Sequence, residues 1–216
     1  MTHEDAKQRF TDIMEKFIGM SSKRLPDDVY AKLKECGEKE DSDIQKVIYN
    51  AYFENLDMAG KLSRPCCQDT GLLHFYIKMG TGFAYQGMVA DCLREATHNA
   101  TYSAPLRQNT VNYFEERNTN DNTGERMPWI NWDIVPDNDD LEIITYFAGG
   151  GCCLPGRSQV FKPSDGYAAI IRYVFDAVSD LGINACPPLI VGVGLGHNAE
   201  NAALLSKKAY LRPLGT

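Results

Sequence analysis

The chain has 216 residues, of which 44% are hydrophobic and 24% charged, as in an ordinary soluble globular protein. No run approaches the ~20 apolar residues of a membrane span, and the amino terminus lacks the basic and apolar regions of a secretory signal, so we expect a cytoplasmic protein without a membrane role. The net charge of -7 argues against a nucleic-acid partner, because phosphate binding leaves a basic footprint.

Three helices are expected in the first 62 residues. Apolar residues at helical spacing predict the first over residues 3–20, with Thr2 as its N-cap. Pro26 opens the second helix, since proline is favoured at helix starts, and Ser42 opens a third with a long apolar face. A helical amino-terminal layer follows from these segments.

The middle of the chain alternates between strands and helices. Residues 72–79 form a mostly apolar run that predicts a strand, and residues 88–100 have the spacing of a helix. Two further strands are expected at 129–135 and 141–148, because they flank the turn-rich segment 136–140. We therefore predict that these two strands pair as a hairpin, which delivers the following glycine-rich loop.

The last third of the chain is expected to hold two helices and a strand. Ser164 caps a strongly amphipathic helix, residues 189–193 are rich in strand formers, and residues 199–211 form a helix with a face of small side chains. The order of elements predicts an α+β fold, in which a mixed β-sheet is flanked by helices with a helical amino-terminal layer. We expect a single domain over residues 1–216.

Two cysteines stand in contexts that suit metal ligands. Cys67 lies in the segment 64–71, beside an amide, a carboxylate and a turn glycine. Cys186 precedes two prolines, which stiffen the backbone that must aim the sulfur. The chain has seven cysteines at irregular spacing, an odd count that favours reduced thiols over disulfides. On helix faces, Cys36 and Cys92 are interpreted as small buried hydrophobic residues.

Four separated motifs carry a family resemblance. They are Arg-Pro-Cys-Cys-Gln-Asp-Thr-Gly at 64–71, Ala-Pro-Leu-Arg at 104–107, Gly-Gly-Gly-Cys at 149–152 and Asn-Ala-Cys-Pro-Pro at 184–188. In order and spacing they resemble the iron-sulfur hydro-lyases of the class I fumarase and tartrate dehydratase type, and the resemblance covers essentially the whole chain. The segment 149–158 looks more like the α subunits of L(+)-tartrate dehydratases than like fumarases, which usually carry Gly-Gly-Gly-Ser followed by polar residues.

The resemblance implies a reaction and a cofactor. The reaction is the dehydration of a 2-hydroxy dicarboxylate, with L(+)-tartrate to oxaloacetate and water first and fumarate/malate interconversion second. The cofactor is a [4Fe-4S] cluster that acts as a Lewis acid through one open iron. Cys67 and Cys186 match two of the three cysteines that hold the cluster in the family.

The resemblance also implies parts that this sequence does not supply. The family's third cysteine, and a histidine shortly before it, lie downstream of a segment that matches residues 212–215, so we expect a carboxy-terminally incomplete chain. The alternative is that Cys66 or Cys152 replaces the third ligand. The sequence offers no convincing base for proton removal, which implies an obligate β-type subunit and a two-fold heteromer.

Five residues are expected to act on the substrate, four of them by resemblance and Arg157 because a net-acidic protein must place cations to bind a diacid. Gln68 and Asp69 contact it by resemblance, and Asp69 assists the leaving hydroxyl group. Arg107 binds a carboxylate through its guanidinium fork, and the amide of Gly150 faces the substrate. Arg157 is a candidate for the far carboxylate of the diacid. The alternatives are that Asp69 only forms a turn, that the glycines only make a tight turn and that both arginines lie on the surface.

Other functions fit the sequence less well. A zinc-stabilised binding module is disfavoured because its cysteines, Cys66, Cys67, Cys152 and Cys153, show no C-x2-C pair. A catalytically silent structural partner of a larger enzyme is a further alternative. The Gly-x-Gly-x-Gly run at 192–196 departs from the dinucleotide-binding spacing, so we interpret its glycines as a means of close packing between a strand and a helix.

Overall fold

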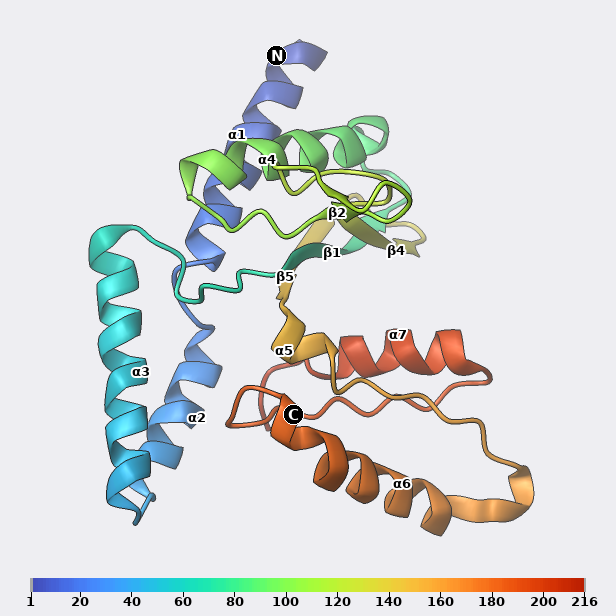
Figure 1. Ribbon diagram of the computed structural model, residues 1–216. Coiled ribbons are helices and arrows are strands. Elements are labelled where there is room, and N and C mark those ends of the chain that lie inside the picture. Colours follow the sequence, from blue (N-terminus) through green and yellow to red (C-terminus); the bar gives the residue numbers. More distant parts are fainter. Residues whose placement is uncertain (1, 216) are drawn as a thin grey trace. The chain divides into compact units, whose positions relative to one another are not determined.

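The structure is a computed structural model that describes residues 2–215 (Figure 1). It divides into two compact units. The first unit comprises the chain up to Leu25 together with Ser42–Gly149, and the second comprises Pro26–Asp41 together with the chain from Gly150 onward. Within the described residues there are seven α-helices and a mixed three-stranded sheet, which confirms the predicted α+β class. No helix in this part of the chain is both long and apolar enough to cross a membrane.

Two helices open the first unit. Helix α1 (His3–Ser21) begins with the predicted cap, because the Thr2 hydroxyl accepts the Asp5 N–H at 3.1 Å and the Asp5 carboxylate accepts the Thr2 N–H at 2.9 Å. Helix α3 (Asp43–Leu62) follows Ser42, as predicted. Its apolar face is mostly exposed, and Ile44 keeps 76% of its surface accessible.

The central strand of the sheet is β1 (Leu72–Gly80). It pairs in parallel with β4 (Trp129–Val135) on one side and antiparallel with β5 (Leu141–Ala148) on the other. The strands predicted at 72–79, 129–135 and 141–148 are confirmed. The predicted hairpin between the last two is wrong, because β1 lies between β4 and β5.

The turn between β4 and β5 explains how this topology is reached. Instead of closing a hairpin, the turn crosses the end of β1, where Gly80 donates to the Asp140 carbonyl and Gly82 donates to the Asn138 carbonyl, both at 2.9 Å. The edge strands are then separated by two strand spacings, roughly 10 Å. The short connection can span this distance, and β1 gains a hydrogen-bonding partner on both sides.

The core of the first unit lies between one face of β1 and two helices. Side chains at alternate positions of β1 point to this face, as the period of a strand requires. Helices α1 and α4 (Val89–Ser103) pack against each other and cover these side chains (Figure 1). The largest fully buried apolar side chains of this core are Ile18, Leu73, Phe75, Ile77, Val89 and Leu93. Each such side chain stabilises the fold by about 1.5–3 kcal/mol.

A polar segment follows α4. It contains a small antiparallel ladder of β2 (Val111–Asn112) and β3 (Arg117–Asn118), and then a polar loop. Asn122 in this loop has a φ of 59°, in the left-handed region that asparagine tolerates better than most residues. The loop is thereby able to turn one asparagine side chain inward.

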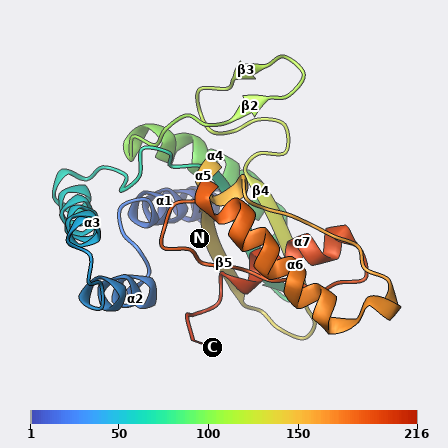
Figure 2. The same cartoon turned by 60° about the horizontal axis from the view of Figure 1, so that its bottom comes forward.

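The second unit contains α2 (Asp27–Glu38), the single turn α5 (Gly150–Cys153), α6 (Gly166–Leu181) and α7 (Ala199–Ala209) (Figure 2). The Asp28 carboxylate accepts the Leu214 N–H at 2.8 Å, which connects the start of α2 to the segment that follows α7. The predicted cap of α6 is wrong. Ser164 lies inside a 3-10 turn, Pro163–Asp165, and α6 starts beyond it with Asp165 in the N-cap position.

The segment 189–193 is not a strand, which contradicts the sequence prediction. No other segment within the described residues pairs with it, and a strand is stable only when its backbone groups have a partner. The segment instead lies along α7. A Cβ atom at Gly192 or Gly194 would overlap the backbone of α7, so the prediction that these glycines permit close packing against a helix is confirmed.

Candidate functional site

The loop between α3 and β1 separates its two adjacent cysteines. Cys66 is half-buried, and its backbone is fixed at both ends: its N–H donates to the Ser22 carbonyl at 2.9 Å, and its carbonyl accepts from the Asn55 side chain at 2.7 Å. Burial raises the pKa of the Cys66 thiol, and the neighbouring Cys67 raises it further. The Cys67 thiol is exposed, so it is the one of the pair that is accessible to a ligand.

Gly71 fixes the path of the same loop into β1. Its φ of 86° lies in the left-handed region, and a Cβ atom there would overlap the backbone of Ala148 and Gly149. Only glycine permits this close approach between the cysteine loop and the end of β5. The loop residues before Gly71 are consequently held beside the first of the three glycines at 149–151.

Asp69 is held by two contacts within the first unit. The Asn109 side-chain amide donates to Asp69 Oδ1 at 2.8 Å. On the other side, a Cβ atom at Gly149 would lie 2.9 Å from Asp69 Oδ2, so the carboxylate lies directly against that glycine. The residue is half-buried, and the Asn109 amide and the Gly149 backbone both constrain the orientation of its carboxylate.

The structure brings Arg107 to the same loop. The Arg107 N–H donates to Thr70 Oγ1 at 3.1 Å, which joins the Ala-Pro-Leu-Arg motif to the residue after Asp69. The side chains of Arg107 and Gln68 are exposed. Three of the predicted site residues, Gln68, Asp69 and Arg107, therefore belong to one connected part of the first unit.

The second unit brings the glycine-rich motif to Cys186. A Cβ atom at Gly151 would lie 2.7 Å from Cys186 Sγ, so only a residue without a side chain fits against this thiol. Gly150 begins the single turn α5, and its carbonyl accepts the Leu154 N–H at 2.9 Å. Two of the motifs that were recognised separately in the sequence are thus adjacent in space.

Lys207 is a residue near this motif that sequence reasoning missed. Burial lowers its pKa, but a hydrogen bond with Tyr210 and the nearby thiols of Cys153 and Cys152 outweigh burial, so the net shift is upward. Its ammonium group also lies over the Tyr210 ring, 5.4 Å from the centroid. In the sequence Lys207 is one of two adjacent lysines at the end of a helix, a pattern that indicates no more than a favourable helix terminus.

Arg157 is exposed and interacts with its own loop. One guanidinium nitrogen donates to the carbonyl oxygen atoms of Gly156 at 2.8 Å and Leu154 at 3.3 Å. These bonds give partners to two backbone carbonyl groups just after the end of α5. A role for Arg157 at a substrate carboxylate stays a prediction.

The cysteine side chains differ in how well they suit an iron-sulfur cluster. None of the seven cysteines forms a disulfide, and Cys67 and Cys186 are exposed whereas Cys92 is fully buried, with an accessible fraction of 0%. Exposed reduced thiols in loops are the kind of donor that a cluster requires. Across residues 2–215, no group of three or more His, Cys, Asp or Glu side chains is arranged to hold a metal ion. The support for Cys67 and Cys186 as ligands is therefore limited to their thiol chemistry and their exposure.

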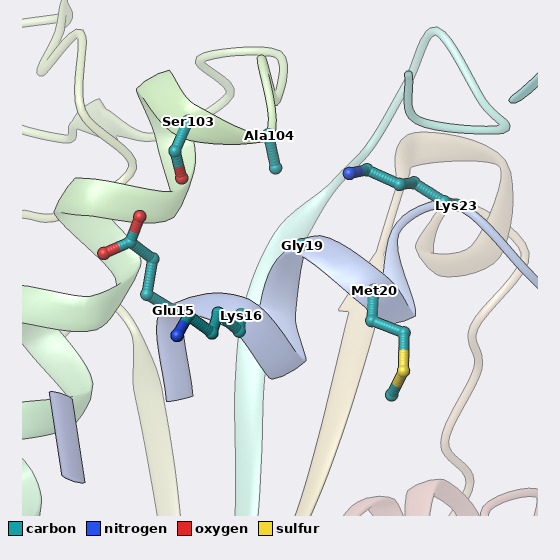
Figure 3. A pocket seen from close by; sticks show the side chains of 7 residues that line it. All are labelled: Glu15, Lys16, Gly19, Met20, Lys23, Ser103 and Ala104. Carbon is teal, nitrogen blue, oxygen red and sulfur yellow. The ribbon is translucent and has the colours of Figure 1, made fainter. Parts of the chain in front are cut away.

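A separate hollow of about 430 Å³ lies between α1 and the end of α4 (Figure 3). It is lined by Glu15, Lys16, Gly19, Met20, Lys23, Ser103 and Ala104. Ala104, the first residue of the Ala-Pro-Leu-Arg motif, belongs to this lining, but none of the proposed cluster ligands or substrate-binding residues does. The hollow is consequently distinct from the candidate site.

Comparison with known proteins supports the resemblance of the motifs. Residues 11–216 match a family described as fumarate hydratase (Fumerase). A protein named L(+)-tartrate dehydratase subunit alpha from Escherichia coli (strain K12) is 49% identical over 213 residues, which are 99% of this chain and 70% of that protein. The protein of the same name from Shigella boydii serotype 4 matches equally. A relative from Methanocaldococcus jannaschii is 32% identical over 210 residues, 96% of this chain and 74% of that protein.

Proposed function

Because this chain belongs to the fumarate hydratase family, we propose that it is the α subunit of a hydro-lyase whose leading reaction is the dehydration of L(+)-tartrate to oxaloacetate and water. Family membership makes it an enzyme that acts on a dicarboxylate. The choice of tartrate is carried by one observation, the 49% identity across nearly the whole chain to a protein named for that activity. The motif at 149–158, which resembles tartrate dehydratases more than fumarases, favours the same substrate.

We propose a [4Fe-4S] cluster as the cofactor, with Cys67 and Cys186 as two of its ligands. The support is the family resemblance together with the exposure of both thiols. When bound, the cluster would supply a Lewis acid that polarises the carbon–oxygen bond of the substrate. Gly151 lets the glycine-rich motif approach the Cys186 thiol closely, because any side chain there would displace the sulfur.

The protein's own groups bind the diacid and handle protons. Arg107 has an exposed guanidinium fork that can accept one carboxylate in two parallel hydrogen bonds. Gln68, the amide of Gly150 and Arg157 are proposed to complete the binding of the substrate. Asp69 is proposed to assist departure of the hydroxyl group, which leaves as water when it gains a proton. The proton on the neighbouring carbon must then go to a base.

We assign that base, and further carboxylate contacts, to a β-type subunit. The relatives are named as alpha subunits, which supports an assembly with a second kind of chain. A two-fold heteromer follows as the proposed assembly. Tartrate dehydration at an enzyme-like rate by this chain alone would contradict the division of labour.

Fumarate/malate interconversion is the second candidate, and the description of the matching family favours it. Both reactions use a four-carbon diacid and differ at the carbon that carries a second hydroxyl in tartrate. We place the discrimination in the segment 149–158, where Cys152, Cys153 and Arg157 are exposed. Measurement of kcat/KM for tartrate and malate with the assembled enzyme decides between them. A higher value for malate would overturn the assignment of tartrate.

The cofactor proposal predicts the behaviour of cysteine variants. Protein purified without oxygen is expected to show a broad visible absorption band that bleaches in air. Cys67→Ser and Cys186→Ser are each expected to lose the band, because fewer thiolates cannot retain the cluster, and Cys36→Ser on α2 is the control that keeps it. A colourless wild-type protein with full activity, or an unchanged band in both variants, would show that these thiols hold no cluster.

The role of Arg107 predicts a binding defect. Arg107→Lys replaces the guanidinium fork with a point charge, and loss of a charged hydrogen bond costs about 2 kcal/mol, roughly a 30-fold rise in KM. The visible band should not change. Arg94→Lys, at an exposed ion pair with Asp91 on α4, is the matched control and should leave KM unaltered. If Arg107→Lys instead removed the band at constant KM, the arginine would be structural.

A further inference from the structure

The segment that carries Arg107 touches the Asp69 loop at two points. Its backbone binds Thr70 through the Arg107 N–H, and the side chain of Asn109 binds the Asp69 carboxylate at 2.8 Å. These two bonds fix the spacing between the proposed proton donor and the proposed carboxylate-binding arginine. Asn109 stood in none of the motifs, so its contact with Asp69 is a new feature of the site.

Asn109 is itself held by a buried residue. Asn122 Oδ1 accepts the Asn109 N–H at 2.8 Å, and the Asn122 amide donates to the Arg107 carbonyl at 2.9 Å and to Thr101 Oγ1 at 3.2 Å. Only 1% of Asn122 is exposed. Both of its amide hydrogens and its oxygen are thus used, as burial of a polar group requires.

Asn122 therefore anchors the segment 107–109 to α4. Thr101 is in α4, and its hydroxyl also lies 2.8 Å from the Thr97 carbonyl one helical turn earlier. A chain of contacts runs from the helix through Asn122 and Asn109 to the Asp69 carboxylate. A rigid element at one end of such a chain holds the group at the other end in a fixed orientation.

We propose that Asn109 is a positioning residue that orients the Asp69 carboxylate toward the substrate, and that Asn122 holds Asn109 in place. This inference rests on the proposed role of Asp69 in the dehydration. Asn109 donates to Oδ1 while Oδ2 lies against Gly149, so both oxygens of the carboxylate are constrained by neighbouring groups. Misplacement of a reacting group by about 1 Å can lower the rate 100-fold. A hydrogen bond that holds the Asp69 carboxylate in place is therefore expected to raise kcat.

The test is a double-mutant cycle in the anaerobically prepared enzyme assembled with its β-type subunit. Asn109→Ser is expected to lower kcat about 10-fold to 100-fold and to leave KM for tartrate within a factor of about three, because Arg107 is untouched. In an Asp69→Asn background, Asn109→Ser should lower kcat no further. Asn109→Gln keeps an amide donor and should recover part of the loss.

The matched control is Asn118→Ser. Asn118 also donates its amide to the same segment, at the Gln108 carbonyl at 2.6 Å, but it is exposed and belongs to the small ladder. It should leave kcat unchanged. Equal losses from Asn109→Ser in both backgrounds would overturn the positioning role and leave Asn109 as a residue of the fold. Full activity of Asp69→Asn alone would instead refute the proposed role of Asp69, so the two failures are distinguishable.

Discussion

Asp69→Asn is expected to lower kcat by about 100-fold to 10,000-fold, the range that general acid–base catalysis contributes. The substitution keeps the shape of the side chain. Its remaining oxygen can still accept the Asn109 amide, so the loop should keep its position. What is lost is the ability to deliver a proton. The fall should therefore appear in kcat, with KM for the diacid changed little.

The control for this variant is Asp57→Asn. Asp57 is on the exposed surface of α3, where its carboxylate pairs with Lys61 one turn away at 2.5 Å. Exposed pairs of this kind contribute only about 0.3–0.5 kcal/mol, and the substitution removes the same charge from the same unit. Both variants should retain the visible band. A kcat for Asp69→Asn within a few-fold of the wild type would remove Asp69 from the chemistry and leave it as a turn residue.

Local signals in the sequence predicted the elements well. The cap at Thr2 and the bounds of the strands at 129–135 and 141–148 depend on neighbouring residues, and the structure has them where they were expected. The pairing of those strands depends on β1, some fifty or more residues earlier, and the hairpin prediction failed for that reason. The strand expected at 189–193 failed because strand formation needs a pairing partner, which residue type alone does not reveal.

The site shows the same division between local and long-range information. The motifs identified Asp69 and Arg107 through their residue types, and the structure joins them through Thr70. The asparagines that hold them carry no local signal. Asn122 lies in a loop of polar residues, a composition typical of the surface, but in the folded protein its side chain is buried. A buried polar residue in a polar loop cannot be told from its exposed neighbours without the contacts that satisfy it.

Gly71→Ala is expected to produce a large loss of stability. The residue has a φ of 86°, where a side chain is strained by roughly 1–2 kcal/mol, and the added Cβ would overlap the backbone of Ala148 and Gly149. Backbone cannot move aside as a flexible side chain can, so overpacking adds about 1–3 kcal/mol. A total of about 3 kcal/mol corresponds to a fall of roughly 6–12 °C in Tm for a chain of this size.

Gly60→Ala provides a control of opposite sign. Gly60 lies in α3 with no heavy atom within 4 Å of an added Cβ, and alanine in a helix interior is favoured over glycine by about 1 kcal/mol. Thermal unfolding followed by circular dichroism should thus show Tm lowered by one substitution and raised by the other. Equal Tm values for Gly71→Ala and the wild type would mean that the loop does not approach β5 as closely as the structure has it. The contact between Asp69 and Gly149 would then fail too, since the same turn holds the carboxylate there.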